Sequence, residues 1–536
     1  MKCNFFKLLF SLALLSFASC VNDETTSTED LNETEGTDGL VEFAVEETNK
    51  NTASKTMGLY TGSGIDFYWT SGDKLWVNNA DVTPSLIIST RDNIQSQLDA
   101  TGNNKAATAK FYFYGTFTKE SYPVRYTGNG NNDADRITIK ETQYQQSPND
   151  GSHIGSDGDC GVAIATKSEG KYKFMLSHKA SYITFTPYYC KGFCSDVKVT
   201  QIKVTADKAI AGNFNFNDNG IELSSRPSAT TQNSSITLVL NGGGTNGFEI
   251  PTKAEFETNG AIMVIAPGTY SKFTVEYTLY DNITKVGGTF TKEYSNLTFT
   301  EGKNKRISSD LDIINRGDKL YMWDAEQDYW YGYEDEQPVI NDVTSEHYPK
   351  SKEKDPNRWY NDVIGSTVNP TTATRGGQIC PNVNEIAWYV FRGNPHWDSD
   401  KLWSFAKHLY KGGMWFKKKS IIIAENQISE DIMKSKAHDG KDYRVFYNGQ
   451  SIINKNIVDT KPSNIDNYFF LPAINYFYNG KFDGEAHNGG YGDYWTSSAT
   501  PYGGSERAIN LGFKKEEAAV RVSSHRSKGS MRIAFE

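Results

Sequence analysis

The chain has 536 residues and a formal net charge of −9 at pH 7, from 56 Lys and Arg against 65 Asp and Glu. This acidic balance provides no basic surface and argues against nucleic acid as a partner. Aromatic residues make up 13% of the chain and glycine occurs 46 times, which is typical of β-strands joined by turns. After residue 20, no apolar run approaches the roughly 18 residues that a membrane helix needs.

Residues 1–20 have the order of an export signal. Lys2 and Lys7 supply positive charge, an apolar stretch extends to Phe17, and two small residues precede Cys20. The apolar stretch is too short to span a bilayer. A cysteine after small residues resembles the lipobox of bacterial lipoproteins, which implies cleavage before Cys20 and acylation of its thiol. A plain signal peptide with an incidental cysteine is the alternative.

Residues 21–39 are almost entirely polar and acidic, so we expect a flexible tether. The acidic stretch Asn22–Glu24 resembles the signal that exports Bacteroidetes lipoproteins to the outer face of the outer membrane. The resemblance implies a surface-exposed protein held in the outer membrane by lipid.

Alternating apolar residues predict a first set of strands between residues 40 and 194. Val41, Phe43 and Val45 alternate with polar neighbours, as in a half-buried strand. Other predicted strands of this region are Lys110–Phe117, Tyr172–Leu176 and Tyr182–Tyr188.

The stretch 195–314 predicts a second set of strands. Apolar positions change phase between Val199 and Ile202, which indicates a bulge near Thr200-Gln201. Further predicted strands are Ser235–Leu240, Ala261–Ala266, Phe273–Leu279, Phe290–Tyr294 and Arg306–Ile313. No helix is predicted between Leu40 and Ile313, so two antiparallel sandwiches are expected.

In residues 315–536, helices are expected beside short strands. Pro381 and Gly393 predict the two ends of a first helix. A second is predicted from Asp398 or Ser399 to Gly412-Gly413, with one apolar face formed by Leu402, Trp403, Ala406, Leu409 and Tyr410. The predicted strands are Tyr468–Leu471, Asp493–Ser498, Arg507–Phe513, Ala518–Val522 and Ser530–Phe535.

Several patterns together resemble the fimbrillin-like proteins of Bacteroidetes. These are the strand Val41–Val45, Trp69-x-x-Gly72-Asp73, Leu176–Ala180 and Pro267-Gly268-x-Tyr270. The resemblance implies two tandem transthyretin-like β-sandwiches, 40–194 and 195–314. It also implies assembly of type V pili by strand exchange with other pilus subunits, after a trypsin-like protease removes the first strand. Lys50 and Lys55 are the trypsin-type sites of the polar linker Glu46–Thr56.

The last block resembles the Fibrobacter major paralogous domain, which is related to the formylglycine-generating enzyme. The residues that carry this resemblance are Cys380-Pro381-x-x-x-Glu385-x-x-Trp388, Leu471–Ala473, Tyr494–Ser498, Ala508-x-Asn510-Leu511-x-Phe513 and Gly529-Ser530-x-Arg532. It implies an α+β, C-type-lectin-like fold for residues 315–536 and a mainly β chain overall.

Catalytic motifs are missing from the sequence. The related enzyme needs two reactive cysteines near its C-terminal end, but Cys380 is the only cysteine after Cys194. Hydrolase, zinc-protease and Walker motifs are absent too, so we expect no enzyme and no cofactor. Cys190 could pair with Cys194, or either with Cys160, in an oxidising compartment, or all could stay free thiols.

Two short motifs could ligate a metal, but each has a simpler interpretation. Asn131, Asp133 and Asp135 alternate as in a calcium loop, but Arg136 replaces the required glycine, which favours a solvated turn. His396-x-Asp398-x-Asp400 could bind a metal, but Asp398 is also suited to capping the helix expected after it. We therefore predict no metal site.

An aromatic loop is the strongest candidate for ligand binding. His487, Asn488, Tyr491, Asp493 and Tyr494 combine rings with carboxylate and amide groups, as sugar sites do. The alternative is that the aromatic rings fill the core.

These observations predict a surface lipoprotein that acts as a pilus tip or accessory subunit with adhesive capacity. Its partners would be other pilus subunits and host or microbial glycans or proteins. The additional C-terminal block favours the tip position, because a stalk subunit ordinarily ends in its own polymerising strand. The alternative is a stand-alone surface glycan-binding lipoprotein that does not polymerise.

Overall fold

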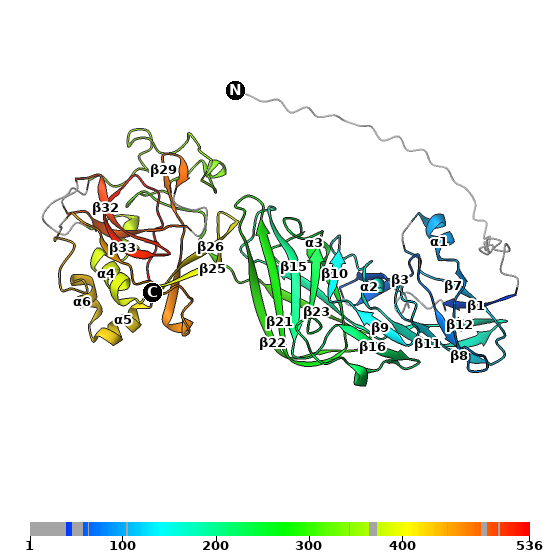
Figure 1. Cartoon of the computed structure of the whole chain (residues 1–536). Helices are drawn as coiled ribbons and strands as arrows, with labels where there is room; N and C mark the ends of the chain where they lie inside the picture. Colours follow the sequence, from blue (N-terminus) through cyan, green and yellow to red (C-terminus); the bar gives the residue numbers. More distant parts are fainter. Residues whose placement is uncertain are drawn as a thin grey trace, which may run out of the picture.

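The computed structural model describes residues 39–45, 57–62, 64–102, 105–341, 343–363, 372–446, 449–483, 490–501 and 504–536. The fold is mainly β, with 43% strand and 11% helix, which confirms the predicted class. Three groups of elements follow one another along the molecule, coloured mainly blue to cyan, mainly green, and mainly yellow to red in Figure 1. Among the described residues, no helix is long and apolar enough to cross a membrane.

The first group is built on one large sheet. In spatial order its strands are β5 (Leu86–Ile88), β4 (Trp76–Asn78), β8 (Ser121–Tyr126), β11 (Gly161–Ser168), β12 (Lys171–Phe174), β1 (Leu40–Val45), β7 (Lys110–Tyr114) and β6 (Arg91–Asp92), with β13 (Ser177–His178) paired to β11. A separate hairpin joins β2 (Met57–Tyr60) to β3 (Ile65–Tyr68). The buried faces of the large sheet share a core rich in aromatic rings, including Phe43, Trp69 and Phe111.

The second group contains several sheets around one core. One sheet has the order β10 (Thr142–Gln145), β18 (Ser235–Leu240), β15 (Val197–Ala206), β21 (Gly268–Asp281) and β22 (Gly287–Phe299), with β19 (Phe248–Glu249) on β15. Another has the order β20 (Ala261–Ile265), β14 (Ser181–Tyr188) and β23 (Asn304–Asp310), and a third has β17 (Gly220–Ile221), β16 (Gly212–Asn217) and β9 (Arg136–Ile139). The predicted bulge is confirmed, because the β15–β21 register shifts between Val199 and Gln201.

Strand pairing crosses the position at which the sequence divides the first two sandwiches. β9, β10 and β14 precede residue 195 but pair with β16, β18 and β20 of the second group. Their buried residues, such as Ile137 and Phe185, belong to the core of the second group. The chain therefore contributes to the second group of sheets before it completes the first.

The expectation of no helix before Ile313 is wrong. The structure has α1 (Ile94–Thr101), α2 (Ile154–Asp157) and α3 (Phe256–Asn259), together with the 3₁₀ turn η1 (Leu223–Ser225). The apolar pattern of α1 is too weak to predict a helix, because α1 is short and only Ile94 is fully buried. Leu98, one turn later, is partly buried against the same core.

The third group combines two main sheets with helices. One sheet has the order β24 (Ile314–Asn315), β25 (His396–Phe405), β26 (His408–Lys417) and β28 (Tyr468–Pro472); the other has β27 (Ile452–Asn454), β33 (Glu517–His525), β32 (Arg507–Lys514) and β31 (Gly492–Ala499). A small hairpin pairs β29 (Tyr476–Tyr478) with β30 (Lys481–Asp483). The helices are α4 (Val383–Arg392), α5 (Lys419–Asn426) and α6 (Glu430–Ser435), with 3₁₀ turns η2 (Glu334–Glu336), η3 (Gly376–Ile379) and η4 (Ile465–Asn467).

The first predicted helix of this group is confirmed as α4. Asn382 caps it, accepting hydrogen bonds from the backbone of Asn384 and Glu385, while Glu385 bonds back to the Asn382 backbone. Gly393 follows its last turn, as the sequence indicates. Pro381 lies just before the cap and not at the first helical position.

The second predicted helix is wrong, since the same residues form the hairpin β25–β26. Ala406 and Lys407 turn the chain with φ of 48° and 65°, and Trp403 pairs with Tyr410 across the strands. Their rings stack with centroids 4.7 Å apart. The predicted strand Ser530–Phe535 is also wrong, because Ser530 and Met531 form only isolated bridges.

The hairpin β25–β26 joins the third group to the second, and Figure 1 shows it between them. Leu402 and Leu409 pack into the core of the second group. The Thr284 hydroxyl donates to the Leu409 carbonyl at 2.8 Å, and a Cβ on Gly288 would come within 2.6 Å of Leu402. The contact between the groups is therefore closely packed.

A buried carboxylate organises the long loops of the third group. Asp324, 1% exposed, accepts hydrogen bonds from the backbone N–H groups of Thr374, Arg375 and Gly377 at 2.8–2.9 Å. Its carboxylate also accepts from the Asn361 side-chain amide at 2.8 Å. One side chain thus fixes the loop that leads to η3.

We expect Asp324→Ala to lower the free energy of unfolding of the third group by about 3 kcal/mol or more, because it leaves several buried N–H groups without acceptors. Asp335→Ala, at an exposed position of η2, is the matched control. Urea unfolding followed by tryptophan fluorescence reports mainly on this group, since eight of the ten tryptophans follow residue 315. Equal midpoints for the two variants would contradict the role of Asp324.

Candidate functional site

The first strand occupies an interior position in its sheet. β1 pairs with β7 in antiparallel fashion and with β12 in parallel fashion, so both of its edges carry hydrogen bonds. Phe43 is fully buried and stacks on Tyr172 with centroids 4.6 Å apart. Val41 and Val45 are partly buried against the same core. Loss of β1 would leave an apolar slot with unpaired strand edges on both sides.

The predicted lipid site and processing sites lie outside the described residues. Cys20 precedes residue 39, and Lys50 and Lys55 fall between Val45 and Met57, the residues that end β1 and begin β2. Acylation and cleavage therefore stay predictions.

Two of the predicted ligand-binding residues are fully buried. Asp493 and Tyr494 are 0% exposed, so the structure does not bring them to the surface. Tyr494 donates to the Pro472 carbonyl at 2.7 Å and stacks on Phe513, as the alternative interpretation expects. His487 and Asn488 lie outside the described residues.

Tyr491, by contrast, lines a surface cavity of about 360 Å³. The other residues of its wall are Tyr476, Asp483, Lys514, Glu517, Arg521 and Lys528. The Lys528 ammonium lies 3.8 Å from the centroid of the Tyr476 ring, and Arg521 forms an ion pair with Glu517. Aromatic faces beside charged groups suit a polar ligand with an apolar face, such as a sugar.

Asp493 is fully buried in β31 and interacts electrostatically with two residues of the cavity wall, Lys528 and Arg521. Burial raises the pKa of its carboxyl group, an effect that the positive charge of Lys528 and the hydrogen bond from Asn510 offset only in part. The Asn510 amide donates to Asp493 at 2.9 Å.

In the two short motifs that could ligate a metal, side chains instead form hydrogen bonds with the backbone of turns. The side chains of Asn131 and Asp133 each accept the N–H group two residues later, as expected for a solvated turn. Asp398 accepts from the backbone of Asp400 and Lys401 at an irregularity of β25, so the prediction that it caps a helix is wrong. His396 contacts the Thr460 carbonyl at 2.8 Å.

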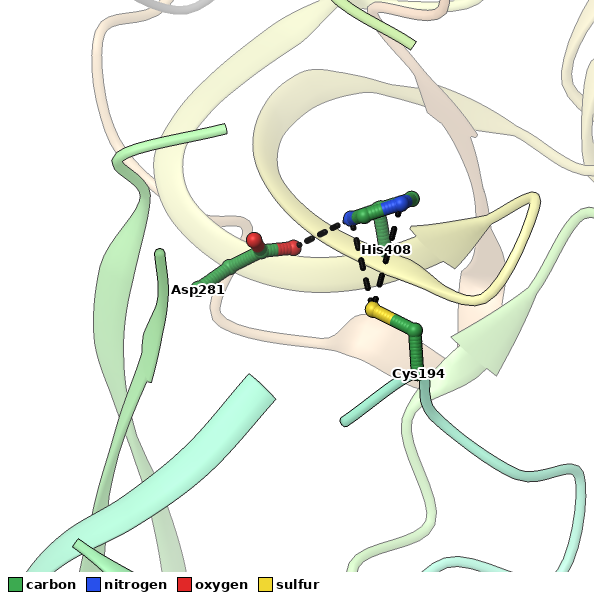
Figure 2. A group of neighbouring side chains, drawn as sticks. All are labelled: Cys194, Asp281 and His408. Atoms are coloured by element: carbon green, nitrogen blue, oxygen red, sulfur yellow. Dashed lines mark hydrogen bonds and ion pairs between the residues drawn. The ribbon is translucent and has the colours of Figure 1, made fainter. Parts of the chain in front are cut away.

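Sequence reasoning missed a cluster where the second and third groups meet. Figure 2 shows Cys194, Asp281 and His408 pointing toward one another from three separate segments. His408 Nδ1 lies 3.0 Å from Asp281 Oδ2 and 3.5 Å from Cys194 Sγ. All four described cysteines are free thiols in the structure. Asp281 lies 87 positions after Cys194, and His408 lies 127 positions after Asp281, so the three residues form no local motif that the sequence could reveal.

The charge state of the cluster follows from its contacts. Burial lowers the pKa of His408, but hydrogen bonds to Asp281 and Cys194 and their charges outweigh it and raise the pKa to about 9. Burial raises the pKa of Asp281, but hydrogen bonds from His408, Leu409 and Ile283 outweigh it and lower the pKa. The structure therefore holds a charged His408–Asp281 pair near neutral pH.

Solved structures of surface proteins from Bacteroides align with this chain at low similarity. No known protein family and no curated protein matches the sequence. Among solved structures, a candidate cell adhesion protein from Bacteroides ovatus aligns with 14% identity and a TM-score of 0.31, over 51% of this chain and 93% of that one. A candidate cell adhesion protein from Bacteroides uniformis aligns with 13% identity and a TM-score of 0.27, over 51% and 94%. A fimbrial protein from Bacteroides ovatus aligns with 8% identity and a TM-score of 0.21, over 92% and 98%. Scores this low establish neither a shared fold nor a shared function.

If the cavity beside Tyr491 binds glycans, Tyr476→Ala should abolish glycan-array signals of the chain, because it removes an aromatic face of the wall. Tyr331→Ala is the matched control, since Tyr331 is 47% exposed in the same group and does not line the cavity. Array signals that persist in Tyr476→Ala, or that disappear in both variants, would exclude the cavity as the binding site.

Proposed function

We propose that this chain is an adhesive pilus subunit that is first held in the outer membrane by an acylated Cys20 and is released by proteolysis. In this proposal a protease cuts at Lys50 or Lys55, β1 leaves with the lipid, and a strand of another subunit fills the slot. The third group is then the adhesive end of the molecule. The interior position of β1 between β7 and β12 is the observation that carries the proposal.

The free energy lost on removal of β1 supports its replacement by a strand of another subunit. An empty slot would leave backbone groups of β7 and β12 without partners and would expose the aromatic core around Phe43. Fully burying one phenylalanine side chain contributes about 1.5–3 kcal/mol, and each unpaired buried backbone group costs a further 1–3 kcal/mol. A strand of another chain with apolar residues at alternate positions would restore both the hydrogen bonds to β7 and β12 and the burial of the aromatic core. Cleavage thus generates a strong, specific binding site.

The chemistry of the linker supports cleavage there. Lys50 and Lys55 are the trypsin-type residues between β1 and β2, so a single cut separates β1 from the rest of the sheet. The new N-terminus would lie close in sequence to β2.

A second candidate function is a stand-alone glycan-binding lipoprotein that keeps β1. The cavity beside Tyr491 favours it, because this cavity lies in the third group and does not depend on removal of β1. The two functions differ in the fate of the linker.

We expect protein released from the cell surface to begin at Asn51 or Thr56 when sequenced from its N-terminus. Lys50→Gln combined with Lys55→Gln should keep the chain intact and out of the pilus fraction. Lys74→Gln, at an exposed lysine beyond β3, is the matched control and should be processed normally. Finding only intact, acylated chain in every fraction would reject the polymerising role and favour the stand-alone function.

Once cleaved, the protein should bind a synthetic peptide with the β1 sequence Leu40–Val45. A peptide carrying Phe43→Asp should bind at least about 100-fold more weakly, because it places a charge in an apolar slot. Fluorescence polarisation with the cleaved and the uncut chain measures both affinities. Equal binding of the two peptides, or equal binding to the uncut chain, would show that the slot does not accept a strand.

A further inference from the structure

The cluster of Cys194, Asp281 and His408 brings three different donor types to one point. Cys194 lies just before β15, Asp281 ends β21, and His408 begins β26. Sulfur, carboxylate oxygen and imidazole nitrogen are the ligand atoms that Zn²⁺ accepts, whereas Ca²⁺ and Mg²⁺ require oxygen. The donor set therefore matches one class of metal ion.

Two donor–donor distances of the cluster are close to those of a tetrahedral site. With Zn–S of about 2.3 Å and Zn–N of about 2.0–2.1 Å, sulfur and nitrogen ligands lie roughly 3.5 Å apart, and nitrogen and oxygen roughly 3.3 Å apart. The structure has 3.5 Å between Cys194 Sγ and His408 Nδ1, and 3.0 Å between His408 Nδ1 and Asp281 Oδ2. All three donor atoms lie within 4.8 Å of one another. Zn²⁺ binding would replace the His408–Asp281 hydrogen bond with bonds from both side chains to the ion.

The surroundings hold the ligands in place. Asp281 Oδ1 accepts the N–H groups of Ile283 and Thr284 at 2.8 and 3.2 Å, which fixes the plane of the carboxylate. The Cys194 backbone donates to the Lys407 carbonyl at 3.0 Å, which holds the cysteine beside the hairpin turn. The His408 side chain is 13% exposed, so an ion and a fourth, water ligand can reach the cluster.

A nucleophilic Cys–His–Asp triad fits the geometry less well. Such a triad places the thiol on one ring nitrogen and the carboxylate on the other, so that the histidine relays a proton between them. Here Asp281 Oδ2 contacts Nδ1, and Cys194 Sγ is closer to Nδ1 than to Nε2, at 3.5 against 3.8 Å. The carboxylate and the thiol therefore do not occupy opposite nitrogens of the ring, as a triad requires.

We propose that Cys194, Asp281 and His408 bind Zn²⁺, which displaces the Cys194 thiol proton and one His408 proton into solvent, and that the ion links the second group of sheets to the third. Two ligands belong to the second group and the third comes from the hairpin β25–β26. Bound Zn²⁺ would fasten the hairpin where Leu402 and Leu409 already pack into the neighbouring core.

Co²⁺ is the probe for this proposal, because a thiolate ligand produces a charge-transfer band and a tetrahedral site produces intense visible bands. The experiment uses the chain without residues 1–20, which removes Cys3 and Cys20 and nothing that the structure describes. With the remaining thiols reduced, one equivalent of Co²⁺ should produce both bands, and Zn²⁺ should abolish them. Zn²⁺ should also raise the melting temperature.

Variants decide whether these three residues are the ligands. Cys194→Ser and His408→Asn should each weaken Zn²⁺ binding by more than about 100-fold, since loss of a mere hydrogen-bonding partner of a ligand already costs 10–100-fold. Cys190→Ser is the matched control, at an exposed thiol four residues away. His396→Asn is a second control, at the far end of the same hairpin.

Each outcome decides the question. Bands lost in Cys194→Ser and His408→Asn but kept in both controls support the site. The proposal is overturned if Co²⁺ gives no thiolate band, if the band survives Cys194→Ser, or if it disappears with Cys190→Ser. Circular dichroism tests whether Cys194→Ser is folded. If it is not, Asp281→Asn replaces it in the experiment, and this variant should also lose the Co²⁺ bands. Failure of this site leaves strand exchange at β1 unaffected, because β1 lies in a different group of sheets.

Discussion

Pairing of both edges of β1 is the constraint on which the first group of sheets depends. A strand in the interior of a sheet satisfies backbone groups on two neighbours, so its removal affects β7 and β12 together. Phe43 adds a packing constraint, because its ring contacts Tyr172, Phe113 and Phe117 at once. β1, the first strand of the described residues, thus contributes both backbone pairing and core packing to its sheet.

Sequence patterns predicted the strands well where one face is buried and the other is not. Ser235–Leu240 is a strand with the predicted bounds, and β21 contains the strict alternation of Phe273–Leu279. The phase change near Thr200-Gln201 correctly predicted a bulge, since a one-residue insertion moves every later side chain to the other face. Such patterns do not encode which strands pair, so the pairing of β10 and β14 with later strands could not be anticipated.

The hairpin β25–β26 shows why spacing alone can mislead. Leu402, Trp403, Leu409 and Tyr410 recur at intervals that fit a helical face as well as two facing strands. Ala406 and Lys407 adopt positive φ, which a two-residue turn between strands requires and which Asn-Gly usually signals. Ala406 and Lys407 are not typical residues of such a turn, so the sequence did not predict it. Tertiary packing of Leu402 and Leu409 against the second group decides in favour of the hairpin.

The same hairpin explains why the cluster of Cys194, Asp281 and His408 was missed. A helix over this segment would have placed His408 on a continuous surface, whereas the hairpin puts it at the start of β26, beside the end of β21. The Asp281 carboxylate accepts the Leu409 N–H at 2.9 Å as well as contacting His408, so one side chain fixes both the backbone and the imidazole of the incoming strand. Candidate residues of the aromatic loop were found through a local pattern, and only Tyr491 of the described ones lines a cavity. A site assembled from three distant segments becomes visible only when the turn that brings them together is known.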